Sequence, residues 1–424
     1  MYQVQNSQAL VAVQRRLFAR GRTGPLVART VMLLGLTSLF TDISSEMVST
    51  VLPLYLVYTV GLSPIAYGFI DGLYQGAGAI VRVASGFVGD RFRRHKEVAA
   101  VGYGLSAFCK LGFLAAGGAV GALSAIIVLD RTGKGIRTAP RDAMISLSTP
   151  KEQLGTAFGV HRALDTTGAM IGPLLAFGML AVAPGRFDAI FMVSFLIALV
   201  GLGILVLFVQ NKREEEAVGE AEPRPPVSVR SALGLMKSKT FSTVVALGCV
   251  LGLATMSDGF VYVGLQHRIG FETRLLPLLY VGTSLVYMVL AVPVGKLADR
   301  YGRMLVFGIG YSLLLVLYAT LLLPSVGPTM LVLCILLFGT YYAATDGVLM
   351  ALASPLLPEE TRGSGLALVT TGTTLARLFG SLAFGTLWTL AGLNAAVIVF
   401  MIALAFALGL TAVLGRRVAR VADA

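Results

Sequence analysis

The sequence predicts an all-α integral membrane protein with twelve transmembrane helices in two six-helix pseudo-repeats. The first observation is composition, since 56% of the 424 residues are hydrophobic and only 13% are charged. Soluble domains carry about 25% charged residues, so most of this chain is expected to lie in a bilayer. The second observation is a series of long apolar runs separated by short polar segments. The third is an internal sequence repeat.

Each predicted helix is an apolar run of at least the roughly 20 residues that span a bilayer. The first six are expected at 29–60, 66–88, 98–118, 121–148, 153–182 and 188–210, and the second six at 241–267, 275–297, 303–323, 329–355, 363–391 and 395–415. These form an N-terminal bundle, 29–210, and a C-terminal bundle, 241–415. The polar, proline-bearing segment 211–240 is expected to be a cytosolic linker. Residues 1–28 and 416–424 are expected to be cytosolic tails.

The positions of Lys and Arg predict the orientation. They gather before the first helix, after the second, fourth, sixth and eighth helices, and at the end of the chain. The loops on the other side carry few cations, with His267, Arg268 and Arg274 as the main exception. Because cytosolic loops are enriched in Lys and Arg, we expect both termini in the cytosol of a bacterial-type inner membrane. The net charge of +12 then reflects contact with lipid, and no nucleic-acid module is recognisable.

Two segments recur at nearly the same spacing. The sequence GFVGDRFRR, from residue 86, returns as GKLADRYGR 209 residues later, and PKEQLG, from residue 150, returns as PEETRG 208 residues later. Two matches at one offset indicate parallel six-helix repeats. Transporters built in this way bind their substrate between the two halves.

The fourth predicted helix carries a row of charges. Asp130, Lys134, Arg137 and Arg141 follow one another at intervals of three or four residues, so they share a helical face, and Arg131 lies beside it. A charge at the bilayer centre costs roughly 2.5–3.5 kcal/mol on insertion scales. We therefore expect this face to line a water-filled central pathway. The alternative is a loop in water, for which the apolar flanks leave little length.

The first and fifth helices carry acids at a similar depth. Asp42 and Glu46 share one face, and so do His161 and Asp165. At 1.5 Å per residue, Asp42 and Asp165 lie about 18–20 Å from the cytosolic end, near the midplane. His161 is either a titrating group or a hydrogen-bonded structural residue.

These charges predict a site for protons. An acid paired with a cation is hard to protonate, and the same acid without its partner protonates readily. The proton-coupling candidates are Asp42, Glu46 and Asp165, with Arg131 as the switching cation. We expect Arg131 and Lys134 to pair with these acids.

The second half contributes isolated charges in its seventh, tenth and eleventh helices. Asp258 and Asp346 either hold Arg377 in a structural pair or contact the substrate. The substrate-binding candidates are Lys134, Arg137, His161, Arg162, Asp258, Asp346 and Arg377. The cation-rich fourth helix favours a substrate with an anionic or zwitterionic group.

No motif for nucleotide hydrolysis or metal chemistry is present. The sequence contains no P-loop, H-E-x-x-H or C-x-x-C, and its three His residues lack metal-ligand spacing. Its three Cys residues imply no disulfide framework. We expect a protein that is not an enzyme and uses no cofactor or metal.

The repeated segments resemble the signature G-x-x-x-D-R-x-G-R-R of the major facilitator superfamily. The first copy lacks the second glycine, whereas the second copy, with Gly302, matches more fully. The resemblance implies a gating role for Asp90, Arg91, Arg94, Asp299, Arg300 and Arg303. The alternative is that the arginines only anchor the topology.

Two further motifs extend the resemblance over residues 29–415. The segment from Arg131 to Gly135 resembles the family's R-x-x-Q-G, with Lys134 in place of glutamine. Gly168, Gly172 and Pro173 resemble the G-x-x-x-G-P of its drug–proton antiporters, and small residues at this spacing let helices pack closely.

Together these features predict a secondary active transporter. We expect proton-coupled antiport, with efflux of a small organic molecule by alternating access, from a monomer in the lipid bilayer. The nearest alternative is a proton-coupled symporter that takes up an anionic or zwitterionic metabolite. A non-transporting membrane sensor is a remoter alternative, and an enzyme of lipid head groups is more remote still.

Overall fold

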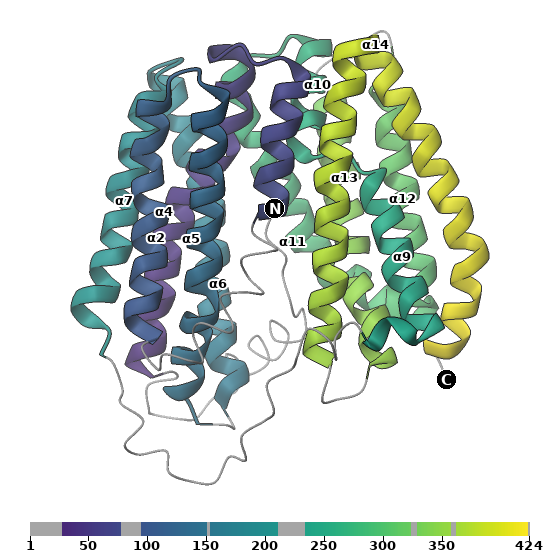
Figure 1. Ribbon diagram of the computed structural model, residues 1–424, viewed down its shortest axis with the longest axis horizontal. Helices are drawn as coiled ribbons and strands as arrows, with labels where there is room; N and C mark the ends of the chain where they lie inside the picture. Colours follow the sequence, from purple (N-terminus) through teal and green to yellow (C-terminus); the bar gives the residue numbers. More distant parts are fainter. Residues whose placement is uncertain are drawn as a thin grey trace.

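The chain forms a bundle of helices in two groups (Figure 1). The computed structural model describes residues 28–77, 95–150, 153–210, 234–323, 329–357 and 362–422. Within these ranges every regular element is a helix, which confirms the all-α fold. The predicted linker 211–240 lies mostly outside the described residues, and its limits stay a prediction.

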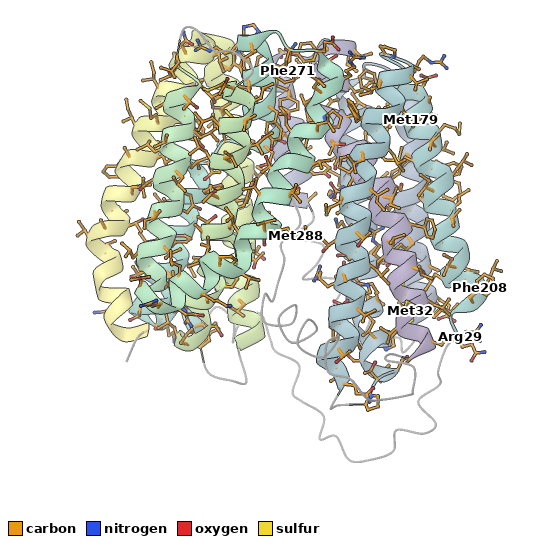
Figure 2. All side chains as sticks on the ribbon, turned by 180° about the vertical axis from the view of Figure 1, so that it is seen from behind. Arg29, Met32, Met179, Phe208, Phe271 and Met288 are labelled. Atoms are coloured by element: carbon orange, nitrogen blue, oxygen red, sulfur yellow. The ribbon has the colours of Figure 1, made fainter. Side chains whose placement is uncertain are left out.

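The N-terminal group holds six helical segments. They are α2 (Arg29–Leu54, continued by the π-helical turn Tyr55–Thr59), a helix at 64–77, α4 (His95–Ala116), α5 (Val120–Leu147), α6 (Leu154–Val182) and α7 (Phe187–Phe208). α2 packs against α6 and α7, and α4 packs against α5. Arg29 and Phe208 lie at one end of this group and Met179 at the other, so the chain leaves the group at the end where it entered (Figure 2).

The C-terminal group begins with a broken helix. Its elements are α9 (Lys239–Leu253), α10 (Asp258–Ile269), α11 (Leu276–Tyr301), α12 (Arg303–Thr320), α13 (Thr329–Ala353) and α14 (Arg362–Ala422). Short 3-10 turns lie at Leu235–Lys237, Thr273–Leu275 and Ser354–Leu356. α14 contains a kink at Gly392, whose φ of 82° is non-helical, so it comprises two helices.

Among the described residues, nine helices are long and apolar enough to cross a membrane. α5 is not among them because its row of charges lowers its hydropathy. The helix at 64–77 is described over 14 residues only, and α14 counts once despite its kink. The membrane fold is confirmed, and the number of twelve helices stays a prediction.

The prediction of one continuous seventh helix is wrong. Residues 254–257 separate α9 from α10. The buried hydroxyl of Tyr318 accepts a hydrogen bond from the Met256 amide at 2.7 Å and donates one to the Ala254 carbonyl at 3.3 Å. The Ser257 side chain caps α10. Tyr318 thus hydrogen-bonds to the amide and carbonyl groups that lose their helical partners at the break. An interrupted helix is therefore stable here.

The two groups meet at one end and lie apart at the other (Figure 1). At the closed end, the Ile65 amide donates to Thr389 Oγ1 at 2.9 Å. A Cβ on Gly68 would lie 2.6 Å from the carbonyl oxygen of Ser381, so only glycine permits this approach. Close packing of small residues therefore joins the helix at 64–77 to α14.

Candidate functional site

The charged row of α5 is placed by a close crossing of α4 and α5. A Cβ on Gly102 would lie 2.7 Å from the Gly133 carbonyl oxygen, and a Cβ on Gly133 would lie 2.7 Å from the Gly102 carbonyl oxygen. Because neither residue has a side chain, the backbones touch. This contact brings Ser106 and Lys110 of α4 within reach of Asp130.

Asp130 is the centre of a buried cluster of ions. Its Oδ1 accepts hydrogen bonds from Lys110 Nζ at 2.8 Å and from Ser106 Oγ at 2.7 Å. Its Oδ2 pairs with Arg131 Nη2 at 2.7 Å. One carboxylate thus pairs with two cations, and all three groups are taken out of water. The cluster borders a small pocket that Ser45, Ser49 and Tyr74 also line.

Arg131 has a partner that the sequence analysis did not name. Its ion pair is with Asp130, and the predicted partner Glu46 interacts with it only at longer range. The guanidinium also stacks on the ring of Tyr74, 3.9 Å from the centroid, which is a cation–π arrangement. Sequence reasoning overlooked the neighbouring residue as a partner because adjacent positions of a helix point in different directions. The long arginine side chain spans that difference.

A pair of buried carboxyl groups lies where α2 crosses α6. Asp42 and Asp165 are 2% and 1% exposed, and their carboxyl groups interact side chain to side chain. Two buried carboxyl groups in contact cannot readily both carry a charge, so they are expected to share a proton. The predicted acids of the first and fifth helices are therefore brought together.

Two arginines flank this pair. Arg137 Nη2 lies 3.9 Å from Asp42 Oδ1, and the Arg137 guanidinium lies over the ring of Tyr103 at 4.7 Å. Arg162 Nη1 lies 3.1 Å from Asp165 Oδ2. Arg141 also interacts electrostatically with Asp165, so cations from both α5 and α6 surround the pair.

The remaining N-terminal candidates surround the carboxyl pair. His161 Nε2 hydrogen-bonds with Ser38 Oγ at 2.9 Å, which fits the structural interpretation of this histidine. The Glu46 carboxylate accepts a hydrogen bond from Ser49 at 2.8 Å. Lys134 interacts electrostatically with both Asp42 and Glu46, as the sequence predicted.

Gly168 and Gly172 lie at the contact of α6 with α2. A Cβ on Gly172 would lie 2.6 Å from the Ile43 carbonyl oxygen, and one on Gly168 would overlap the Leu39 carbonyl oxygen. Pro173 follows inside the same helix. This close approach places Asp165 against Asp42.

We predict that Gly172→Ala destabilises the protein by about 1–3 kcal/mol, because the added methyl group meets backbone atoms that cannot move aside. The matched control is Gly178→Ala in the same helix, where no atom lies within 4 Å of the added Cβ. Thermal unfolding in detergent should show a lower midpoint for Gly172→Ala only. Equal midpoints for the two variants would contradict the close helix contact.

The candidates of the C-terminal half lie around the broken helix. The hydroxyl of Tyr342 donates to Asp258 Oδ1. Arg377 lies among the hydroxyl groups of Tyr311, Tyr341 and Tyr342 and interacts with Asp346 at longer range. No ion pair within 4 Å joins Arg377 to Asp258 or Asp346, so the predicted structural pair is not formed.

The gating candidates are described in part. Asp90, Arg91 and Arg94 lie outside the described residues. Arg303 pairs with Asp299 at 3.1 Å and donates to the Ala351 carbonyl at 2.9 Å, which ties the start of α12 to α13. Arg300 lies over the ring of Tyr301. Gly302 between them has a φ of 104°, which favours glycine at this position of the motif.

Several residues of the site were not among the predicted set. They are Ser38, Asp71, Tyr103, Ser106, Lys110 and Ser381. Asp71 and Lys110 carried a signal, since each is a charge inside an apolar run. The aromatic and hydroxyl residues carried none, because such residues are common in packed membrane helices.

Comparison with known proteins places the chain in a family. The sequence model of the Major Facilitator Superfamily matches residues 34–381 and 260–423. An uncharacterised MFS-type transporter of Methanocaldococcus jannaschii is 32% identical over 374 residues, which are 85% of this chain and 89% of that protein. An uncharacterised protein of Mycobacterium bovis is 24% identical over 380 residues, covering 87% of this chain and 89% of its own length.

Solved structures share the fold at low sequence identity. The nucleoside transporter NupG superposes with a TM-score of 0.73 at 14% identity, over 92% of this chain and 98% of its own. A bacterial homologue of the human lysosomal transporter Spinster, in an inward-facing and unoccupied conformation, has a TM-score of 0.69 at 14% identity, over 95% and 99% of the two chains.

Proposed function

The chain belongs to the Major Facilitator Superfamily, and from its buried charges we propose that it is a proton-coupled antiporter that exports a small organic molecule. As a member of this family it is a multi-pass membrane protein and a secondary transporter. The proposal adds the coupling ion, the direction of transport, a monomeric unit and an inner-membrane location with cytosolic termini.

The observation that supports proton coupling is the Asp42–Asp165 carboxyl pair. A shared proton is stable while Arg137 stays 3.9 Å from Asp42. If the helices move so that Arg137 approaches, its positive charge replaces the proton as the partner of the carboxylate. Proton release is thereby tied to the relative position of α2, α5 and α6. Arg137, rather than Arg131, is the switching cation in this proposal.

The other N-terminal charges have supporting roles. Glu46 and Lys134 lie close to the pair and set its local potential. The Asp130 carboxylate pairs with both Lys110 and Arg131, and Arg131 is held against Tyr74. Arg162 holds Asp165 in place. The signature residues Asp299, Arg300 and Arg303, with Asp90, Arg91 and Arg94, are proposed to control opening at the cytosolic end.

A test uses purified protein in liposomes that contain a pH-sensitive dye. We expect organic compounds from a panel of anions, zwitterions and cations to drive proton flux, with protons moving opposite to the exported substrate. Arg137→Gln should reduce this flux roughly tenfold or more, as expected for the loss of about 1.4 kcal/mol at a charged contact. The matched control is Arg186→Gln, which removes an exposed loop arginine that pairs with Asp188 at 2.9 Å.

The direction of flux decides between the two candidate functions. Uptake of substrate together with protons would support the symporter instead. The row of cations on α5, Arg131, Lys134 and Arg137, is the feature that favours it. Full flux in Arg137→Gln would contradict the proposed switch. Absence of flux with every compound would favour a sensor.

A further inference from the structure

A second polar pocket lies at the break between α9 and α10, where the two halves meet. Polar and charged side chains from both halves border it. Gln75 comes from the N-terminal half, and the break itself, Asp258, Tyr342, Arg377 and Ser381 come from the C-terminal half. Beside it, Ser381 Oγ donates to Asp71 Oδ2 at 2.5 Å, across the two halves. Transporters bind substrates at such interrupted helices between repeats.

Arg377 is the cation of this pocket. Within the described ranges no acidic oxygen lies within 4 Å of its guanidinium, whereas Arg131, Arg137 and Arg162 each have such a partner. Its neighbours are the hydroxyl groups of Tyr311, Tyr341 and Tyr342, and the carboxyl group of Asp346 interacts with it only at longer range. Arginines inside a membrane are costly unless an anion or a polar path balances them. An anionic group of a ligand would supply that balance.

Asp258 is the anion of the same pocket. It is buried, and its Oδ1 accepts the hydroxyl of Tyr342, while no cation lies within 4 Å of it among the described residues. A carboxylate accepts more than one hydrogen bond, so it has capacity for a second donor. Its place at the start of α10 stabilises negative charge through the helix dipole.

The two opposite charges therefore border one pocket without touching. Tyr342 lies between them, since it hydrogen-bonds to Asp258 and interacts with Arg377. We propose that this pocket binds the charged head of a zwitterionic substrate, with the carboxylate on Arg377 and the ammonium group on Asp258. The planar guanidinium suits a carboxylate because it donates two parallel hydrogen bonds. This inference rests on the proposed transport function and names its substrate class.

The test measures binding to the purified full-length protein by calorimetry at pH 7, without a proton gradient. The probes are L-phenylalanine, L-leucine and 5-aminovalerate, each with its methyl ester, which lacks the negative charge, and its N-acetyl form, which lacks the positive charge. We expect at least one of the three zwitterions to bind, and its ester and N-acetyl forms to bind at least tenfold more weakly.

The variants assign each charge to its residue. Arg377→Gln should weaken binding of the zwitterion at least tenfold and leave binding of the ester unchanged. Asp258→Asn should also weaken binding of the zwitterion at least tenfold, but it should leave binding of the N-acetyl form unchanged. Arg377→Lys should recover part of the affinity. If a variant does not fold, the comparison of the three probe forms on the wild type still decides.

Three results would overturn the inference: no zwitterion binds, an ester or N-acetyl form binds as tightly as its parent, or the folded Arg377→Gln and Asp258→Asn variants keep full affinity. Because binding requires no proton movement, this outcome is independent of the flux assay on Arg137. Proton coupling can therefore fail while zwitterion binding holds, and the reverse.

Discussion

Asp130→Asn should destabilise the folded protein by about 3–5 kcal/mol, because it leaves two buried cations without a counter-ion. Lys110 is only 2% exposed, and its ammonium group lies 2.8 Å from the carboxylate that the substitution removes. Arg131 loses the same partner at 2.7 Å. Since membrane proteins have limited net stability, we expect little folded protein after extraction, as measured by size-exclusion chromatography and thermal unfolding.

The control for this prediction lies on the same helix. Asp142 pairs with Arg141 at 2.9 Å, but its side chain is 42% exposed, so water can replace the lost charge. Asp142→Asn should therefore change stability by at most about 1 kcal/mol. Combining Asp130→Asn with Lys110→Met should recover part of the loss, because one uncompensated cation is removed. An Asp130→Asn protein as stable as the Asp142→Asn protein would show that the cluster is not what holds α4 to α5.

The fold was predictable from sequence because its signals are local and repeated. Apolar runs of bilayer length predicted the helices. The helices α5, α6 and α7 begin and end within a few residues of the expected positions. So does α2, when the π-helical turn that continues it to Thr59 is included. The break at 254–257 was not predictable in this way. Its residues are mostly small or apolar, and it is stabilised by Tyr318, which lies more than 60 residues further along the chain.

The site was predictable in its residue types and less so in its pairs. A charge inside an apolar run is recognisable wherever it occurs, so Asp42, Asp165 and Arg377 could be selected from sequence. Which charges meet depends on how closely helices cross, and that is set by glycines such as Gly102 and Gly133. Sequence spacing predicts which residues share a face of one helix. It does not predict how closely that helix packs against the next one.

The carboxyl pair should be required for full uphill transport but not for exchange. Asp42→Asn and Asp165→Asn each remove one of the two groups that hold the shared proton, so we expect substrate accumulation driven by a pH gradient to fall severalfold but to stay measurable above protein-free liposomes. Exchange of labelled for unlabelled substrate needs no net proton movement and should persist. A general loss of folding would abolish both activities, so the comparison separates coupling from stability.

The double variant adds a second criterion. If Asp42 and Asp165 act as one proton site, Asp42→Asn/Asp165→Asn should be no worse in uphill transport than either single variant, because groups that act as a unit are non-additive. Asp188→Asn, at an exposed loop pair, is the matched control and should keep full coupling. Independent, multiplying losses from the two substitutions would instead indicate two separate sites. In that case the contact of the two carboxyl groups would be structural, and Glu46 would become the next acid to test.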